Sequence, residues 1–431
     1  MAVHPASEAS VSAEPPGAHE EQQDHERHDE HEGHQVPSPR VPVDAETRPS
    51  RPHLSELRLA AFAVHRRVRL PLGPCTLLVG PSGSGKTSAL RAYEALARLG
   101  AGGEVGEVFP DPGACVPQSA RPDAGRRRGF HIGCTADGPE GPVRLDVAVQ
   151  AEPELRIVGE RLTADGVVLL ETALRDPSRR AVQAAWHTAG SAAVTRAPLP
   201  DDRLGTALLP LRVAGKTDGQ RRVLAAAEQM VVALRSVFAC DPRPDRMRAP
   251  VPTGSGRLLG GCDNLADVVF RTRAECVRRH AQFVAAVDAG CAGVVTGVRA
   301  ELLGDGTVRA VLDRGAAGGA VGGAVPGRPG GGTTLERLGD GELRYLALAL
   351  VLFTGPGVLE VDPVGEVPAA MQTLTVLADG FDRRLDPRQR DELLRLAARM
   401  CDRGHIRLLG TVTDASWAAR AEGVTVVHLD A

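Results

Sequence analysis

Near the start of its patterned part, the chain changes from a strand-like to a helical spacing of apolar residues. Apolar and polar positions alternate at 57–59 and 64–72, which predicts one or two strands. A continuous apolar run at 75–80 predicts a buried strand. Residues 86–99 carry apolar side chains at helical spacing, and Gly100 ends that pattern. The strands are therefore expected to lead directly into a helix.

The rest of the chain alternates between strand-like and helical patterns less regularly. Residues 101–142 are loop-rich and 176–220 are poorly patterned. Strands are expected at 143–150, 155–162 and 167–172, and helices at 220–238 and 263–289. The last elements expected are a helix at 341–353, a strand at 373–378, a helix at 387–403, and strands at 406–411 and 424–429. Strand–helix alternation at both ends predicts an α/β sheet with another segment inserted.

These patterns divide the chain into four parts. Residues 1–53 are polar and acidic, so they cannot bury enough apolar surface to offset their ordering entropy, and we expect a disordered tail. Residues 54–175 and 333–431 are expected to form the two halves of one domain. Between them, 176–332 is expected to form a mostly helical lobe that ends in a glycine-rich linker.

Histidines recur at every third position in the tail, at His25, His28, His31 and His34. This spacing is compatible with a weak transition-metal site or a pH-sensitive segment. A solvated tail whose histidines bind nothing specific is the simpler interpretation.

Composition limits the classes of function. The 431 residues carry a formal net charge of −3, which excludes a histone-like, broadly basic nucleic-acid coat. Aromatic residues make up only 3% of the chain, so a stacking platform for single-stranded nucleic acid is weakly supported. Lys86 and Lys216 are the only lysines, and this arginine-rich, alanine-rich composition is typical of a high-GC bacterial genome.

The cysteines and the N-terminus indicate a compartment. The eight cysteines form no CxxC pair, and MAVHPASEAS lacks the basic and apolar regions of a signal peptide. No apolar run approaches the roughly 20 residues that a membrane span needs. We therefore expect reduced thiols and a soluble, cytoplasmic protein without a membrane partner.

One motif carries clear chemistry. Residues 80–87 match GxxxxGK[ST] in full, between a predicted buried strand and a predicted helix, which is the context of a P-loop. Glycines let successive backbone N–H groups point at phosphate oxygens at the helix start. The nucleotide-binding residues expected are Gly80, Pro81, Ser82, Gly83, Ser84, Gly85, Lys86, Thr87 and Ser88. Lys86 would bind the β/γ-phosphates of ATP, and Thr87 would supply a hydroxyl to Mg²⁺.

A second segment narrows the class of NTPase. The sequence LERLGDGELRYLALALVLF at 335–353 resembles the signature segment of ABC-class ATPases in its RecF-, SMC- and OLD-like version. The resemblance implies that a helix N-terminus contacts the γ-phosphate of a nucleotide held by a second subunit. The signature residues acting in trans would be Leu338, Gly339, Asp340, Gly341 and Glu342.

Weaker matches lie in the order that this family shows. They are the opening strands with the loop around Phe62, the segments 128–130 and 156–162, and RLLGGCDNLADVV at 257–269. The resemblance, to ABC-class ATP-binding proteins of an actinobacterial type, covers about 54–431. It implies a P-loop NTPase of the ABC-ATPase type, with a mixed sheet flanked by helices.

The family's Walker B strand ends in an Asp that assists Mg²⁺ and a Glu that polarises the attacking water. Two positions fit the Asp, namely Asp362 in VLEVDP and Asp379 in LTVLADGFDRRLDP. The second overlays the family pattern better. Thr413 takes the position of the family's switch histidine, and the segment from Asp379 to Thr413 has room for one helix and one strand. We therefore assign Asp379 as the catalytic and metal-binding residue, which makes 355–372 an insertion.

On this alignment three elements of the family's machinery are altered. Gly380 stands at the glutamate position, Thr413 at the switch-histidine position and Gly339 at the signature serine. Gly380 cannot orient a water, and losing a water-positioning group costs orders of magnitude in rate. Nearby acids that could substitute are Asp382, Glu360 and Glu366, each of which is also explained as a solvated surface residue.

Other candidates stay open. The family's Q-loop glutamine could be Gln118 or Gln150, and either could equally be structural. The basic run Arg126–Arg128 could contact nucleic acid or a partner's phosphate, although three charges are usually a solvated loop.

Three functions remain in competition. The first is an ATPase in which Mg-ATP closes a homodimer that slow hydrolysis reopens. The second is a switch that binds ATP, barely hydrolyses it and signals to a protein partner of unknown identity; Gly380 and Thr413 favour it. A P-loop kinase acting on a small molecule would leave the signature segment without a role. Nucleic acid is a conceivable partner without independent support.

Overall fold

The computed structural model describes residues 51–188, 193–315, 332–361, 368, 372–419 and 421–429. Residues 49–431 form one compact unit. Most of the predicted disordered tail, its histidine tract and most of the glycine-rich linker lie outside the described residues. Within the described part, no helix is both long enough and apolar enough to cross a membrane.

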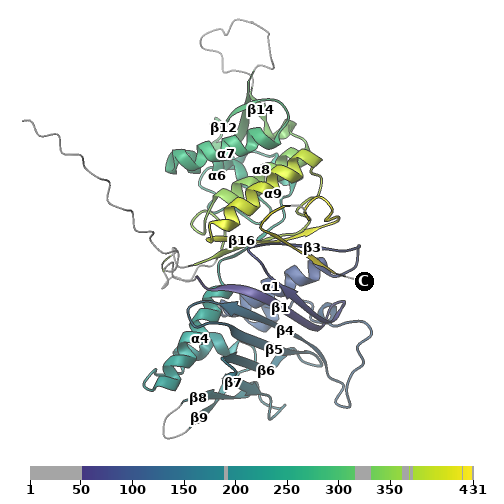
Figure 1. Cartoon of the computed structure of the whole chain (residues 1–431), viewed down its shortest axis with the longest axis vertical. Helices are drawn as coiled ribbons and strands as arrows, with labels where there is room; N and C mark the ends of the chain where they lie inside the picture. The colour runs from purple at the N-terminus through teal and green to yellow at the C-terminus, as the bar shows by residue number, and fades with distance from the viewer. Residues whose placement is uncertain are drawn as a thin grey trace, which may run out of the picture. The chain divides into compact units, whose positions relative to one another are not determined.

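The first sheet is antiparallel and has eight strands in the order β2-β1-β4-β5-β6-β7-β8-β9 (Figure 1). Side chains alternate between its faces, as Leu57 and its partner Cys134 illustrate on the buried face. The helix α4 (Asp218–Leu234) covers that face. The strands are β1 (His53–Phe62), β2 (His65–Pro71), β4 (Arg128–Asp137), β5 (Val143–Glu152), β6 (Arg156–Ala164), β7 (Val167–Ala173), β8 (Ala181–His187) and β9 (Val194–Pro200).

The second sheet is parallel and has the order β10-β15-β16-β3-β17. Its strands are β10 (Val237–Cys240), β15 (Leu374–Ala378), β16 (Ile406–Val412), β3 (Cys75–Val79) and β17 (Val424–His428). Both faces of β3 are buried: Leu77 belongs to one hydrophobic core and Leu78 to the other. This is why CTLLV is a continuous apolar run.

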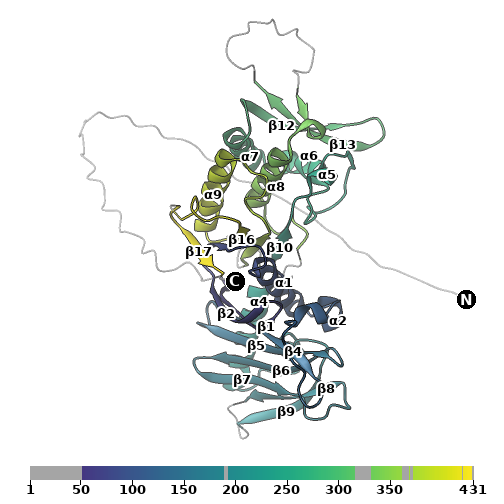
Figure 2. The same cartoon turned by 90° about the vertical axis from the view of Figure 1, so that its right-hand side faces the viewer.

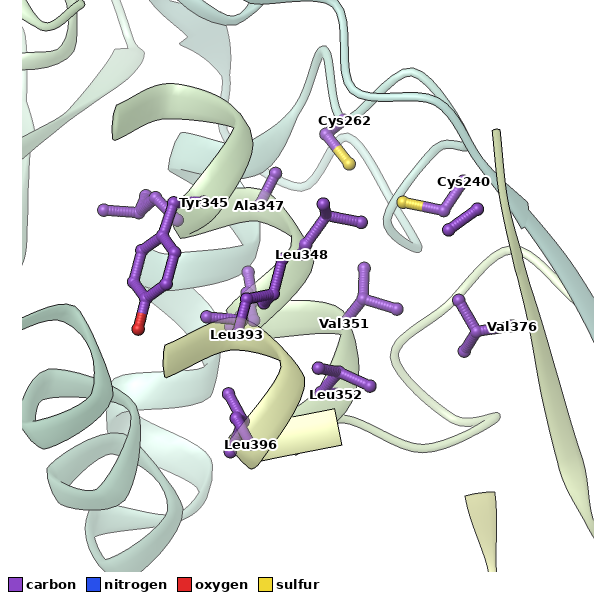
Figure 3. Close-up of a cluster of buried hydrophobic side chains, with 14 of the residues drawn as sticks. Cys240, Cys262, Tyr345, Ala347, Leu348, Val351, Leu352, Val376, Leu393 and Leu396 are labelled. Carbon is purple, nitrogen blue, oxygen red and sulfur yellow. The ribbon is translucent and has the colours of Figure 1, made fainter. Parts of the chain in front are cut away.

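Helices cover both faces of the parallel sheet (Figure 2). On one face, α1 (Lys86–Gly100) packs between this sheet and the antiparallel one. On the other face lie α8 (Asp340–Phe353) and α9 (Pro387–Asp402). The side chains of α8 from Leu343 to Leu352 are all buried, and Figure 3 shows Leu348 and Val351 between α9 and Val376 of β15. The signature helix is therefore fixed against the strand that leads to Asp379.

The remaining elements contact the N-terminal half of α8. A small antiparallel sheet has the strand order β11-β13-β12, with β14 paired to β13. The elements are α5 (Pro244–Met247), β11 (Val251–Pro252), α6 (Leu265–Glu275), α7 (Val277–Gly290), β12 (Val295–Leu302), β13 (Thr307–Arg314) and β14 (Thr333–Thr334). Short helical turns complete the chain at α2 (Val105–Val108), η1 (Gly113–Cys115), α3 (Gly205–Leu208), η2 (Leu209–Leu211) and η3 (Leu335–Arg337).

The predicted fold class, α/β with the P-loop between a strand and a helix, is confirmed. Two parts of the sequence contain more strand than the pattern indicated. The loop-rich stretch 101–142 contains β4, and the segment expected to be mostly helical contains α4, α6 and α7 together with six strands from β8 to β13. The expected helix at 220–238 ends at Leu234, because its last apolar residues belong to β10.

Candidate functional site

The P-loop lies at the carboxyl end of β3 and continues into α1. Gly83 and Gly85 have φ values of 85° and 91°, a region that only glycine enters without strain. Gly85 is the residue preceding the helix, and a Cβ there would lie 2.4 Å from His65 Nε2. The His65 ring nitrogen lies 3.0 Å from the carbonyl oxygen of Gly85, so the β1–β2 hairpin supports the loop from outside.

Burial lowers the pKa of His65 below its ordinary value of 6.5, and the bond to Gly85 opposes that shift. The imidazole is therefore held neutral against the loop.

The cationic side chain of the motif, Lys86, and its hydroxyl side chain, Thr87, have different hydrogen-bond partners. The Lys86 ammonium donates to the carbonyl oxygens of Gly80 and Pro81 at 2.6 and 2.9 Å. The Thr87 hydroxyl donates to Asp379 Oδ2 at 2.9 Å. The P-loop and the segment after β15 are far apart in sequence, and they meet through the side chains of Thr87 and Asp379.

Asp379 is held at the carboxyl end of β15 by the neighbouring strand. Thr411 of β16 donates its hydroxyl to Asp379 Oδ1 at 2.6 Å, and the Gly380 N–H donates to the same hydroxyl at 2.7 Å. One carboxylate oxygen thus faces β16 while the other faces Thr87. A hydroxyl and a carboxylate so placed suit a hard cation that prefers oxygen ligands, such as Mg²⁺.

The backbone after Asp379 turns through a conformation that requires glycine. Gly380 has φ 62°, and a Cβ there would lie 2.7 Å from Arg383 Nε. The guanidinium of Arg383 therefore occupies the space that a side chain at position 380 would enter. The Thr413 N–H donates to Asp382 Oδ2 at 3.2 Å, so Asp382 supports the end of β16.

The signature segment begins α8, with Gly339 as the residue preceding the helix. Asp340 in its first turn pairs with Arg248 at 2.6 Å and with Arg384, and the bond to Arg248 leads the causes that lower the pKa of Asp340. Glu342 pairs with Arg314 at 2.9 Å. The acids of LGDGE are thus matched by arginines.

Arg344, the last residue of LGDGELR, was given no separate role by the sequence analysis, and it connects α8 to the end of β15. It is 3% exposed. Its guanidinium donates to Asp241 Oδ1 at 3.1 Å, to the Pro242 carbonyl at 2.8 Å and to the Gly380 carbonyl at 3.0 Å. Together with the Asp340–Arg384 pair, this arginine therefore joins LGDGELR to the segment after Asp379.

Asp241 is a second residue of this region that the sequence analysis did not single out. It directly follows β10, whose last residue Cys240 pairs with Ala378 of β15. Asp241 lines a pocket of about 440 Å³ together with Thr87 and Asp379. A short apolar strand followed by Asp-Pro, in VFACDP, is the available signal, but its first two residues fall within the helix predicted at 220–238.

The other sequence candidates lie elsewhere. Gln150 is on β5 and donates to the Glu154 carbonyl, and Gln118 is in the loop after η1. Neither glutamine is among the residues that line the pocket beside Thr87 and Asp379. Glu360 is exposed and lines a different pocket. Asp362 and Glu366 lie outside the described residues. In the basic run, Arg127 pairs with Asp123 and Arg128 with Glu152.

No known protein-family model and no curated protein sequence matches the chain. Among solved structures, it is similar to an SMC head bound to the C-winged helix domain of ScpA, at 13% identity over 87% of this chain and 94% of that one, with a TM-score of 0.47. The SMC head domain from Thermotoga maritima gives 14% identity, 86% and 92% coverage and a TM-score of 0.39.

A third similar structure is an Smc head with an extended coiled coil, bound to the C-terminal domain of ScpA derived from Pyrococcus furiosus. It gives 12% identity, 88% and 93% coverage and a TM-score of 0.41. These values describe only a general resemblance.

Proposed function

We propose that this chain binds Mg-ATP at its P-loop and that binding closes a homodimer, which slow ATP hydrolysis reopens. The observation that carries the proposal is the hydrogen bond from Thr87 to Asp379 at the mouth of the P-loop. It joins a hydroxyl and a carboxylate at the helix start where phosphates bind.

The residues present fit the roles that Mg-ATP requires. Backbone N–H groups of Ser82–Ser88 and the Lys86 ammonium would bind the phosphates. Lys86 would exchange its two carbonyl partners for phosphate oxygens, which carry full negative charge and accept stronger hydrogen bonds. Thr87 and Asp379 would hold Mg²⁺, which neutralises charge that develops on the phosphates.

The signature segment supports the dimeric part of the proposal. The start of α8 offers backbone N–H groups from Gly339 onward, and nothing lies within 4 Å of a Cβ placed at Gly339. Asp340 would repel a phosphate, but Arg248 and Arg384 offset its charge. A nucleotide held by a second copy could therefore approach this helix start.

An ATP-sensing switch is the second candidate. Gly380 brings no side chain to the water position, and the Thr413 N–H is directed to Asp382. If no other acid acts, the closed dimer would persist and signal to a protein partner. The two candidates share nucleotide binding and differ only in turnover. A cytoplasmic location stays part of the proposal.

The test is nucleotide binding and turnover on the same samples. We expect fluorescent ATP to bind the wild-type chain in the presence of Mg²⁺, and Lys86→Ala to weaken binding at least tenfold. Lys216→Ala is the matched control, because Lys216 is the only other lysine and is exposed. Equal loss in both variants, or no binding by the wild type, would refute the proposal.

Closure is measured separately. Light scattering with and without Mg-ATP should show a dimer that forms only with nucleotide, and Gly339→Glu should prevent it without weakening ATP binding, because it adds a charge to the open helix start. A monomer at saturating ATP would contradict dimer closure and leave nucleotide binding standing.

A further inference from the structure

We infer that Asp241 is the acid that polarises the attacking water. The family pattern gives this role to a glutamate at the position that Gly380 occupies. This inference rests on the proposed function and names a catalytic residue for it. It starts from strand order: β10 and β15 are adjacent and parallel, so their carboxyl ends lie at one edge of the sheet. Adjacent strands are roughly 4.8 Å apart.

The pocket at this edge contains few acids. Its lining includes Asp379, Asp241 and Glu94 beside Thr87. Asp379 is engaged by Thr87 and Thr411. Glu94 lies two helical turns beyond Thr87 on α1, which is about 10 Å along the axis. Asp241, at the end of the neighbouring strand, is thus the acid best placed beside the metal-binding pair.

The contacts of Asp241 fix its carboxylate while leaving it accessible. Arg344 donates to Oδ1 at 3.1 Å, and Arg383 lies 3.7 Å from the same oxygen. The side chain is 50% exposed. Among the residues that the structure describes, both contacts are made by Oδ1, so Oδ2 can accept a proton from water.

The two arginines also connect Asp241 to the turn at Gly380. Arg383 fills the space beside Gly380, where the glutamate side chain would start. Arg344 ties Asp241 to the Gly380 carbonyl, so the acid is held relative to the same turn. Arg344 is a positioning residue, since its own partners are Asp241 and main-chain oxygens.

The step is in-line hydrolysis of ATP. The water oxygen forms a bond to the γ-phosphorus, and the bond from that phosphorus to the β–γ bridging oxygen breaks. The electron pair leaves on the β-phosphate of ADP. The water proton passes to Asp241 Oδ2 and then to solvent, and the products are ADP and inorganic phosphate.

The central test compares Asp241→Asn with wild type for ATP affinity and for turnover. We expect affinity within about threefold and turnover reduced at least 100-fold, because the amide cannot accept the proton. Asp245→Asn is the control: it removes the same charge four residues along the chain, in α5. Asp245 is 93% exposed, and its loss leaves Arg248 its partner Asp340. Turnover of Asp241→Asn within threefold of wild type would overturn the inference.

A second experiment separates catalysis from a merely structural effect on Arg344. Asp241→Ala opens space in the pocket, and formate added as the probe should restore turnover several-fold, while chloride at equal ionic strength should not. Circular dichroism melting verifies that each variant is folded. No rescue by formate in a folded Asp241→Ala protein would count against the inference.

The remaining outcomes are equally decisive. If Glu94→Gln abolishes turnover and Asp241→Asn does not, Glu94 is the acid and the inference is wrong. If the wild type binds ATP but turns over none, the role of Asp241 is overturned while nucleotide binding stands. If the wild type binds no ATP, the proposed function itself has failed.

Discussion

Replacing Arg344 by Met tests whether a buried guanidinium holds the site together. Met retains the apolar stem but removes the hydrogen bonds to Pro242, Gly380 and Asp241. Each charge-assisted bond to a main-chain carbonyl, buried at Pro242 and part-buried at Gly380, is worth about 1.5 kcal/mol. The bond to Asp241 contributes less, because that carboxylate is half exposed and regains water. We therefore expect the free energy of unfolding to fall by about 3 kcal/mol.

Urea unfolding measures this change. Trp417 packs against the same hydrophobic core as α8, whereas Trp186 lies in the other core. Trp417 fluorescence in a Trp186→Phe background therefore reports on unfolding of the core that contains α8. Arg161→Met is the control, since Arg161 and its partner Glu171 are 55% and 50% exposed. That surface pair should contribute at most about 1 kcal/mol.

Two outcomes would contradict the reasoning. If Arg344→Met lowers stability by no more than Arg161→Met, the buried hydrogen bonds add nothing beyond a surface pair. If Arg344→Met is stable and its ATP turnover is unchanged, Arg344 does not position Asp241. A stable variant with reduced turnover would instead assign the arginine to positioning alone.

Three further predictions concern the surrounding structure. Gly380→Ala should destabilise by about 1–2 kcal/mol because its left-handed φ and the nearby Arg383 both disfavour a Cβ, measured by urea unfolding. Because burial lowers the pKa of His65, its neutral form favours the folded state, so stability should fall as pH drops below about 6.5, and His65→Gln should flatten that dependence in thermal melts. Asp386→Ala should cost about 1 kcal/mol in the same melts, since it removes the capping box with Gln389 at the start of α9.

The parts of the fold that were predicted correctly share one property: their pattern is local. The P-loop lies between a buried strand and a helix because the apolar run of β3 and the glycines after it are contiguous in sequence. The helix α8 begins at Asp340, within the LGDGELR segment, because that segment leads straight into an apolar run. Both features required no knowledge of what packs against them.

The errors have a different physical origin. The residues of β10 continue the apolar pattern of α4, so periodicity could not show that Arg235 and Ser236 break the helix. The strands β12 and β13 form a hairpin in which β-branched residues alternate irregularly with small and charged ones, so the period-two pattern is interrupted. For β10 the deciding contact comes from the distant strand β15, whereas for β12 and β13 it comes from the neighbouring strand of the hairpin.

The same reasoning explains why Asp379 could be proposed from sequence and Asp241 could not. Asp379 follows a strand with a family-like pattern, but an acid after VFAC has meaning only once β10 is known to pair with β15. Parallel strands bring their carboxyl ends to one edge, so strand order, and not sequence distance, decides which acids share a pocket. Where Gly380 brings no side chain to one strand end, the next strand end can therefore supply an acid. The paired Asp241→Asn and Asp245→Asn measurements decide whether Asp241 is that acid in this chain.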